Sequence, residues 1–256
     1  MIVKNVRLKK MEQYVIDHDF VSMDELCEVF EISKNTARSD VAELVEKGVI
    51  EKKYGGVSVI TTRVPTSYQE RTEKNKESKK EVGRLAATLL EEGDLIYIDA
   101  GTTTSFLVAK GNQLPQQLTI ITNNVNVINQ SFRENGFTVF SLPGKLNREM
   151  NSFISLETID SLKNYNIKKA FIGARGVSGS GDISVASAVD AKLKEMVLSI
   201  SECSILMTDF EKFKSAAMIN FSHLNKFDYW VCEKSTPEMQ EIADNYGVKL
   251  LTTTSP

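Results

Sequence analysis

Apolar residues recur at helical spacing through the first 48 residues and at extended spacing directly after them. This pattern predicts three helices, over residues 6–18, 22–30 and 33–48. Ser22 and Ser33 are good N-caps for the second and third helices, and Glu25 completes a capping box with Ser22. Residues 49–59 form two short extended runs around a Gly-Gly pair, which predicts a β-hairpin. The first part of the chain is therefore expected to hold three short helices and a hairpin.

From about residue 80 onward, apolar runs with strand character alternate with helical patterns. The strands are predicted over residues 95–99, 118–122, 137–142, 169–173, 203–208 and 228–232. The helices are predicted over residues 80–91, 105–110, 186–201 and 237–246. This rhythm is typical of an α/β domain with a doubly wound, mainly parallel sheet and helices on both of its faces.

A polar stretch separates the two patterns. Between residues 61 and 80 the chain is short of large apolar residues and carries Pro65, as linkers often do. We therefore predict two domains, of residues 1–59 and 80–256, with a linker of residues 60–79. With 256 residues, of which 41% are hydrophobic, the chain is long enough for a small and a large core.

The third predicted helix has an apolar stripe and an opposite polar face, and it follows a short helix and a tight turn. This is the arrangement of a helix-turn-helix, in which the first turn of the second helix meets base edges in the major groove of DNA. With the hairpin, the segment reads as a winged helix. The residues expected to contact DNA are Ser33, Lys34, Asn35, Thr36, Arg38 and Ser39 on the helix, and Lys52, Lys53 and Tyr54 on the hairpin.

Charge limits how DNA can be bound. The chain has 31 Lys and Arg against 34 Asp and Glu, a net charge of -3, which argues against a protein that coats nucleic acid by bulk electrostatics. Residues 1–57 alone carry nine basic and eleven acidic residues, so a positive face has to be local, on the third helix and the hairpin. On the fold pattern alone, a three-helix module for dimerisation or protein binding is an open alternative.

Other classes of protein are disfavoured by composition. The longest apolar runs, such as Leu95 to Ile98, fall far short of the roughly 20 residues of a membrane helix, and the first ten residues lack the apolar core of a signal peptide. The cysteines have spacings that fit no zinc module, so we expect reduced core thiols in a cytoplasmic protein. Two histidines leave little for histidine-based catalysis, and we expect neither metal nor cofactor. The cysteines are Cys27, Cys203 and Cys232, and the histidines are His18 and His223.

Polar turns follow the predicted strands. The run from Asp99 to Thr104 stands between a strand and a helix, where backbone N–H groups and the helix dipole favour a phosphate. Because the carboxyl ends of parallel strands meet at one edge of a sheet, the turns are expected to line one crevice, although each alone can be a plain turn. The candidate ligand residues in these turns are Asp99, Gly101, Thr102, Thr103, Thr104, Thr122, Asn123, Gly144, Lys145, Gly173, Ala174, Arg175, Gly176, Asp209 and Lys212.

The run ISKNTARSDVAELVEKGVIEKKYGGV resembles the DNA-binding signature of the DeoR family of bacterial transcriptional regulators. The matching positions are Ser33, Thr36, Arg38, Asp40, Leu44, Gly48, Gly55 and Gly56. Two positions depart from the family pattern: Ala37 replaces an isoleucine, and Ser39 replaces a second arginine. The second change removes one expected phosphate or base contact.

The strand-end turns resemble, in the same order, the effector domain of that family. The resemblance adds Asp190, Ala191 and Lys194 to the candidate site, with Asp190 in place of a glutamate and Glu211 in place of a serine. It implies a fold of the ribose-5-phosphate-isomerase type and a phosphorylated sugar as the effector. In its finer details the chain is similar to repressors of inositol catabolism.

Together these features indicate a transcriptional regulator, specifically a repressor of a carbohydrate catabolic operon, whose affinity for operator DNA changes when a phosphorylated sugar binds. One winged helix buries too little surface for tight operator binding, so we expect a homodimer or tetramer. Two alternatives stay open. One is a sugar-phosphate isomerase fused to a DNA-binding module, with Asp99, Asp190, Asp209 and Lys212 available for acid–base chemistry. The other is an adaptor that binds proteins.

Overall fold

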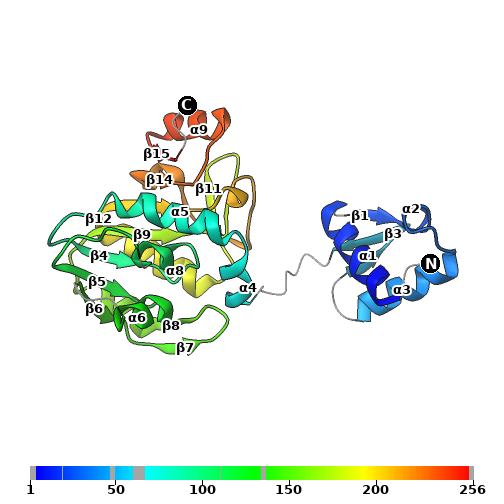
Figure 1. The fold of residues 1–256 in the computed structure, drawn as a ribbon, viewed down its shortest axis with the longest axis horizontal. Helices are drawn as coiled ribbons and strands as arrows, with labels where there is room; N and C mark the ends of the chain where they lie inside the picture. Colours follow the sequence, from blue (N-terminus) through cyan, green and yellow to red (C-terminus); the bar gives the residue numbers. More distant parts are fainter. Residues whose placement is uncertain are drawn as a thin grey trace. The chain divides into compact units, whose positions relative to one another are not determined.

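The computed structural model describes residues 4–18, 20–46, 50–59, 67–109, 111–133 and 137–253. The chain forms two compact units, Met1–Val64 and Pro65–Pro256, which we describe separately (Figure 1). Among the described residues, no helix combines the length and the apolar character needed to cross a membrane.

The N-terminal unit packs three helices against a small antiparallel sheet. Its elements are α1 (Lys4–His18), β1 (Phe20–Ser22), α2 (Met23–Val29), α3 (Lys34–Glu46), β2 (Ile50–Lys53) and β3 (Gly56–Val59), with strand order β1-β3-β2. The Oγ of Ser22 caps α2 by accepting a hydrogen bond from Glu25 N at 3.1 Å, which is the serine half of the predicted capping box, whereas Glu25 Oε1 accepts a hydrogen bond from the hydroxyl of Tyr14 at 3.1 Å. The predicted helices and hairpin are confirmed, β1 was not predicted, and the predicted helix end at Gly48 lies outside the described residues.

The apolar stripes of the three helices close one core with the hairpin. Its buried members are Leu8, Met11, Val15, Val21, Leu26, Val41, Leu44, Ile50 and Val57. Gly56 lies where β3 passes β1, and a Cβ there would sit 2.3 Å from the carbonyl oxygen of Val21. The second glycine of the motif is therefore required by close backbone packing, which fixes the hairpin against β1.

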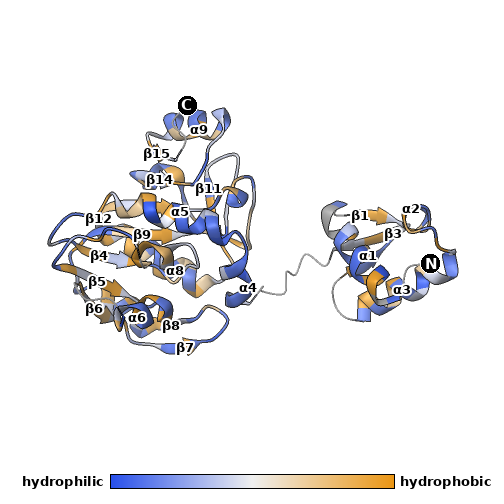
Figure 2. Ribbon diagram, viewed as in Figure 1, coloured by the Kyte–Doolittle hydropathy of each residue, from blue (hydrophilic) through white to orange (hydrophobic). Residues whose placement is uncertain are grey.

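The C-terminal unit is built on a parallel seven-stranded sheet. In spatial order its strands are β15 (Lys249–Leu251), β14 (Tyr229–Val231), β12 (Ser201–Met207), β9 (Ile167–Gly173), β4 (Leu95–Ile98), β5 (Leu118–Thr122) and β6 (Phe137–Ser141). All six predicted strands are present, and Figure 2 shows much of the sheet as hydrophobic. The predicted α/β class with a parallel sheet is confirmed, and only β15 was missed in this sheet.

Helices cover both faces of the sheet, because alternate residues of its central strands face two separate cores. Tyr97 and Ile121 face one core together with residues of α7 (Leu156–Leu162), α8 (Ala188–Ile200) and α9 (Pro237–Tyr246). Ile96 and Ile120 face the other core with residues of α5 (Lys76–Ala87), α6 (Val125–Ser131) and the 3₁₀ helix η1 (Thr104–Val108). The helix predicted at residues 105–110 is thus a shorter 3₁₀ segment, and Lys110 lies outside the described residues.

Short elements that the sequence pattern did not predict complete this unit. They are an antiparallel sheet of β10 (Gly176–Val177), β11 (Asp182–Val185) and β13 (Ile219–His223), a hairpin of β7 (Lys145–Asn147) and β8 (Ser152–Ile154), and the 3₁₀ turns η2 (Phe210–Lys212) and η3 (Leu224–Lys226). The three cysteines are free thiols, as expected. Burial raises the pKa of Cys203 to about 11 and raises that of Cys232 as well, so neither is an activated thiolate.

The second half of the predicted linker is folded, so that prediction was wrong there. Residues 68–73 form α4 (Tyr68–Glu73), which Ser67 and Glu70 close with a capping box, and α5 begins at Lys76. Tyr68 and Lys79 are buried against the sheet domain. The stretch looked like a linker because its exposed face is charged, whereas one aromatic ring and one lysine stem anchor it. Residues 60–66 lie outside the described residues.

Candidate functional sites

The polar face of α3 is open to solvent. Lys34, Asn35, Arg38 and Ser39 are all exposed, as the helical pattern predicted. The side chain of Ser33 accepts a hydrogen bond from the N–H of Thr36 at 3.2 Å and so caps the helix. No ion pair joins Arg38 to an acidic side chain among the described residues. This face therefore presents a cation and several small polar groups at the start of one helix.

Two exposed ion pairs modify the charges near this face. Lys34 Nζ lies 2.7 Å from Asp24 Oδ1, and this hydrogen bond raises the pKa of Lys34. On the hairpin, Lys53 Nζ lies 2.9 Å from Glu51 Oε1. Tyr54 is wholly exposed at the hairpin tip, and Lys52 is exposed beside it. Because exposed ion pairs are weak, Lys34 and Lys53 can exchange their carboxylate partners for phosphates.

Asp40 has a different role from its neighbours in the motif. It is buried, and its two carboxylate oxygens accept hydrogen bonds from Arg7 Nε at 2.6 Å and Arg7 Nη2 at 3.2 Å. This bidentate ion pair fixes α3 against α1, although its two residues are 33 positions apart in the sequence. The signal in the sequence is an acidic residue on the apolar side of α3. Arg7 is thus a positioning residue that the sequence patterns did not reveal.

At the carboxyl ends of the strands, Asp99 is the centre of a buried cluster. Its Oδ2 accepts hydrogen bonds from the N–H of Gly173 at 3.0 Å and from the ammonium of Lys194. Lys194 Nζ also lies 3.5 Å from Asp190 Oδ1. Thus the ends of β4 and β9 and the helix α8 bring together two carboxylates and one ammonium.

Burial sets the protonation of this cluster. Desolvation raises the pKa of Asp190 to about 6, although Lys194 acts in the opposite direction. For Lys194, burial lowers the pKa, but Asp190 and Asp99 outweigh it and the pKa is raised. Asp99 Oδ1 is buried and accepts no hydrogen bond from any described group. Asp190 Oδ1 is also buried and has only the ion pair with Lys194.

The glycines of the turns are required by close packing. A Cβ on Gly101 would lie 2.9 Å from Thr104 Oγ1, and one on Gly173 would lie 3.3 Å from Asp99 Oδ2. Gly176 passes so close to Ser215 that a Cβ would lie 2.3 Å from its carbonyl oxygen. These positions keep the strand-end loops in contact, and this contact brings Asp99 next to β9.

Several predicted polar residues bond the backbone and shape the site. Thr104 Oγ1 donates to Asp99 O at 2.7 Å, and Thr122 Oγ1 donates to Ile98 O at 2.6 Å. Asn123 is buried between the hydroxyl of Tyr97 and the carbonyl of Phe153. Thr102 is half-buried and Thr103 is buried in the same loop. Asn124, which the sequence did not single out, holds this loop by donating to the carbonyls of Asp99 and Gly101.

Two predicted residues lie apart from the cluster. Gly144 has a φ of +148°, and a Cβ there would lie 2.6 Å from Thr158 Oγ1. Lys145 is exposed at the start of β7. No hydrogen bond or ion pair between described residues joins either of them to Asp99. Their place is the turn after β6, two strands away from β4.

The folded half of the predicted linker contributes to the site. Asn75 Nδ2 donates to Asp209 Oδ1 at 3.1 Å, while Asp209 Oδ2 is buried without a hydrogen-bond partner among the described groups. Burial lowers the pKa of Lys79 to about 8, and among the described groups its ammonium donates only to backbone carbonyls of the same segment. Burial and then Arg175 lower the pKa of Arg71 to about 10. Arg71, Asn75 and Lys79 recur every four positions, and this helical period is the signal in the sequence that the segment is folded.

The charge of Glu211 is compensated. Its carboxylate lies 2.9 Å from Lys74 Nζ, and hydrogen bonds from Asn75 and Lys74 lower its pKa. Lys212 and Arg175 are half-buried in the neighbouring loops. The rim of the site therefore has more positive than negative charge, although the sequence places an acid there.

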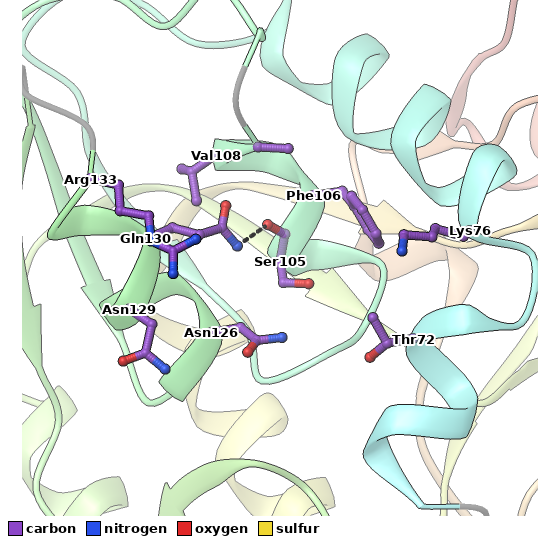
Figure 3. A pocket seen from close by; sticks show the side chains of 10 residues that line it. Thr72, Lys76, Ser105, Phe106, Val108, Asn126, Asn129, Gln130 and Arg133 are labelled. Carbon is purple, nitrogen blue, oxygen red and sulfur yellow. Dashed lines mark hydrogen bonds between the residues drawn. The ribbon is translucent and has the colours of Figure 1, made fainter.

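A separate groove of about 720 Å³ opens between α4, α5, η1 and α6 (Figure 3). Gln130 Nε2 donates to Ser105 O at 3.2 Å across it, and Lys76 and Arg133 stand at its ends. None of the predicted effector residues lines this groove. Among the described residues, no group of histidine, cysteine and acidic side chains is arranged to hold a metal ion.

Comparison with known proteins assigns both units. A model of the DeoR-like helix-turn-helix domain matches residues 7–63, and a model of the DeoR C-terminal sensor domain matches residues 74–234. The chain belongs to the DeoR family. As the motifs indicated, it is a DeoR-family transcriptional regulator with a DNA-binding domain and a sensor domain. The sensor match begins inside the segment that the sequence pattern assigned to a linker, in agreement with its folded structure.

Several curated relatives match this DeoR-family chain over almost their full length. The transcriptional regulator IolR of Bacillus subtilis is 30% identical over 88% of this chain and 89% of its own. The repressor GlcR of the same organism is 28% identical over 96% and 95%. The glycerol-3-phosphate regulon repressor of Escherichia coli is 27% identical over 91% and 93%.

Solved structures with similarity to this chain include a ribose 5-phosphate isomerase A from Neisseria gonorrhoeae, which is 16% identical over 54% of each chain with a TM-score of 0.38. The eIF2B β subunit of Chaetomium thermophilum is 14% identical over 89% of this chain and 65% of its own, with a TM-score of 0.42.

Proposed function

We propose that this DeoR-family regulator represses a carbohydrate catabolic operon and that a phosphorylated sugar, bound at the strand ends of the sensor domain, changes its affinity for the operator. The observation that carries the proposal is a set of buried, unsatisfied carboxylate oxygens beside buried and half-buried cations. The oxygens are Asp99 Oδ1 and Asp209 Oδ2. The cations are Arg71, Lys79, Arg175 and Lys212.

The two halves of this set suit the two halves of a sugar phosphate. An ionised carboxylate oxygen accepts hydrogen bonds and therefore selects hydroxyl groups. A phosphate is bound best by guanidinium and ammonium groups, which form charge-assisted hydrogen bonds with its oxygens. A ligand with hydroxyls at one end and a phosphate at the other matches both kinds of group at once.

On the DNA side, we propose that α3 lies in the major groove. Lys34, Asn35, Thr36 and Arg38 would meet base edges, and Lys52 and Lys53 would meet flanking phosphates. With so few phosphate contacts per subunit, tight binding requires at least a homodimer on repeated half-sites. GlcR and the glycerol-3-phosphate regulon protein are both named as repressors, which supports repression as the mode of action. A regulator that reads operator DNA works in the cytoplasm.

We propose that the sensor domain performs no turnover. Asp99, Lys194 and Asp190 have the chemistry of acid–base catalysis, but the relatives that span the whole chain are named as regulators. A turnover assay with pentose and hexose phosphates tests this point. Conversion at ordinary enzymatic rates would refute a sensor without activity.

The decisive experiment is a thermal-shift screen of the full chain against phosphorylated sugars, with inorganic phosphate and the unphosphorylated sugars as controls. A cognate ligand at 100 times its Kd stabilises the folded state by about 2.7 kcal/mol, whereas both controls should give much less. The ligand identified in this way should then change operator affinity. No stabilisation by any member of the panel would contradict the proposal.

A variant separates the sensor from the DNA reader. Thr103→Val removes a hydroxyl from the loop after β4 and should abolish the response to the effector while DNA binding by the free protein stays intact. If the effector still releases the variant from DNA, the phosphate binds elsewhere.

A further inference from the structure

One edge of the large sheet is open. Strand β6 pairs with β5 on one side, and no described backbone group forms a hydrogen bond to its other side. Thr138, Phe140 and Ser141 are exposed along the strand. Its sequence, Phe-Thr-Val-Phe-Ser, contains no charged residue. Monomeric proteins usually protect such an edge with charges, proline or a covering segment, because its free N–H and C=O groups are a template for another strand.

The opposite edge of the same sheet has this protection. Strand β15 is only three residues long and begins with the exposed Lys249, whose ammonium lies over the ring of Tyr229. A short edge that carries a lysine resists pairing with a second strand. One edge of the sheet is thus protected against pairing with another strand, and the other edge is not.

Exposed aromatic rings flank β6 on both layers. Phe140 is 48% exposed, and its ring lies 6.5 Å from that of Tyr165. Phe132, at the end of α6, is 83% exposed, and α6 packs beside β6 (Figure 1). Phe137 and Val139 point to the other face and pack against a core. The open backbone edge is therefore bordered by apolar surface that the described chain leaves uncovered.

We propose that β6 is the interface between two copies of this chain, which pair antiparallel about a two-fold axis at Val139. An axis perpendicular to the sheet keeps each side chain on its own face, so residues at equal distances from the axis pair with one another. With all five residues paired, Val139 lies opposite its own copy and Phe140 lies opposite the partner's Thr138. The two sheets then form one continuous sheet, and both Phe140 rings are covered.

A second copy fits this edge better than an unrelated partner. The strand offers no charge to select a foreign sequence, and it has no like charge to repel a second copy of itself. The need for a dimer rests on the proposed function, since one winged helix binds an operator weakly. The choice of β6 as the interface rests on the sensor domain alone.

Sedimentation of the full chain tests the interface. Phe140→Lys and Thr138→Lys each place a charge on the open edge and should convert a dimer into a monomer. Met218→Lys is the matched control, because Met218 is 84% exposed and lies beside β13 in the small sheet. This control should sediment as the unchanged chain does. A monomeric unchanged chain, or two edge variants that stay dimeric, would overturn the proposal.

A cross-link gives an independent test. Paired residues of antiparallel strands have Cβ atoms about 4.5–5.5 Å apart, close enough for a disulfide after small adjustments. Val139→Cys should therefore yield a covalent dimer on mild oxidation, whereas Met218→Cys should stay monomeric on a denaturing gel. Failure to cross-link in a chain that sediments as a dimer would place the interface elsewhere. Operator binding is measured in parallel, so a dimer that binds no DNA refutes the proposed function and leaves the interface standing.

Discussion

The two polar regions of this regulator, the face of α3 with the hairpin and the cluster at the strand ends, differ in their exposure to solvent. On α3 and the hairpin, the candidate DNA contacts are exposed apart from the half-buried Thr36, and the pair of Lys34 with Asp24 is exposed as well. At the strand ends, Asp99, Asp190 and Lys194 are buried. An exposed ion costs the free protein little, whereas a buried ion carries a desolvation penalty until a partner compensates it. The difference suits a large partner that meets a hydrated surface and a small ligand that must be enclosed.

The buried cation should give the largest effect on stability. Lys194→Met leaves Asp99 and Asp190 buried without a cation and should lower the free energy of unfolding by about 3–5 kcal/mol. Urea denaturation near neutral pH measures the change. The exposed Lys192 lies on the same helix, and Lys192→Met should stay within about 0.5 kcal/mol of the original chain. Equal losses in the two variants would remove the distinction between the regions.

Asp190→Asn should stabilise the free protein by about 1–3 kcal/mol at pH 7.5. The folded state raises the pKa of this carboxyl to about 6, so the original chain loses stability as the pH rises from about 4 to 6. The variant is neutral throughout, and its advantage should therefore be absent below pH 4 and complete above pH 6. Denaturation at several pH values checks this, with Asp160→Asn as the control, because Asp160 is exposed on α7. An advantage that does not depend on pH would contradict the assignment.

The exposed face should show the opposite behaviour, with an effect on binding and none on stability. Arg38→Ala should weaken operator binding by about 1–3 kcal/mol, because it removes a contact to DNA. Its melting temperature should be unchanged, since Arg38 is exposed. Fluorescence anisotropy with operator DNA and a thermal melt measure both quantities, and Lys163→Ala in the sensor unit serves as the control. Unchanged affinity for the operator would remove Arg38 from the DNA-contacting face.

The smallest expected effect is the uptake of a proton when the effector binds. Because burial lowers the pKa of Lys79 to about 8, the free protein is only partly protonated there, and a bound phosphate would raise that pKa again. Effector binding should thus take up about half a proton at pH 8, and the affinity should fall as the pH rises from 7 to 9. Calorimetry in two buffers of different ionisation enthalpy measures the uptake. Lys79→Met should abolish it, and an unchanged uptake in that variant would assign the proton to another group.

The strands and their common edge were predictable, because parallel strands buried on both faces read as apolar runs. The bounds of β5 and α9 agree with the pattern to the residue, and Asp99, Gly173 and Lys194 do meet. The family relationship was predictable for a related reason: the motifs stand in loops whose packing needs glycine and threonine at fixed places.

Contacts between distant segments were not predictable. The partner of Asp40 lies 33 residues away on α1, and a local pattern shows only an acid on an apolar stripe. Segment α4 is short and charged, so its composition suited a linker, while Tyr68 alone supplies its buried ring. The unsatisfied oxygens at the strand ends exist only once the chain has folded, since they depend on which donors the fold withholds.

The strand order also determines when each part can form during synthesis. All elements of the N-terminal unit lie within 60 residues, so this unit can fold as soon as it leaves the ribosome. Strand β9 pairs with β4 about 70 residues before it and with β12 after it, and Asp99 cannot meet Gly173 until the chain has reached that glycine. The DNA-binding domain of a nascent chain can therefore be folded well before its sensor domain has been synthesised. A product of truncated translation would contain a DNA-binding domain without a sensor domain that responds to an effector.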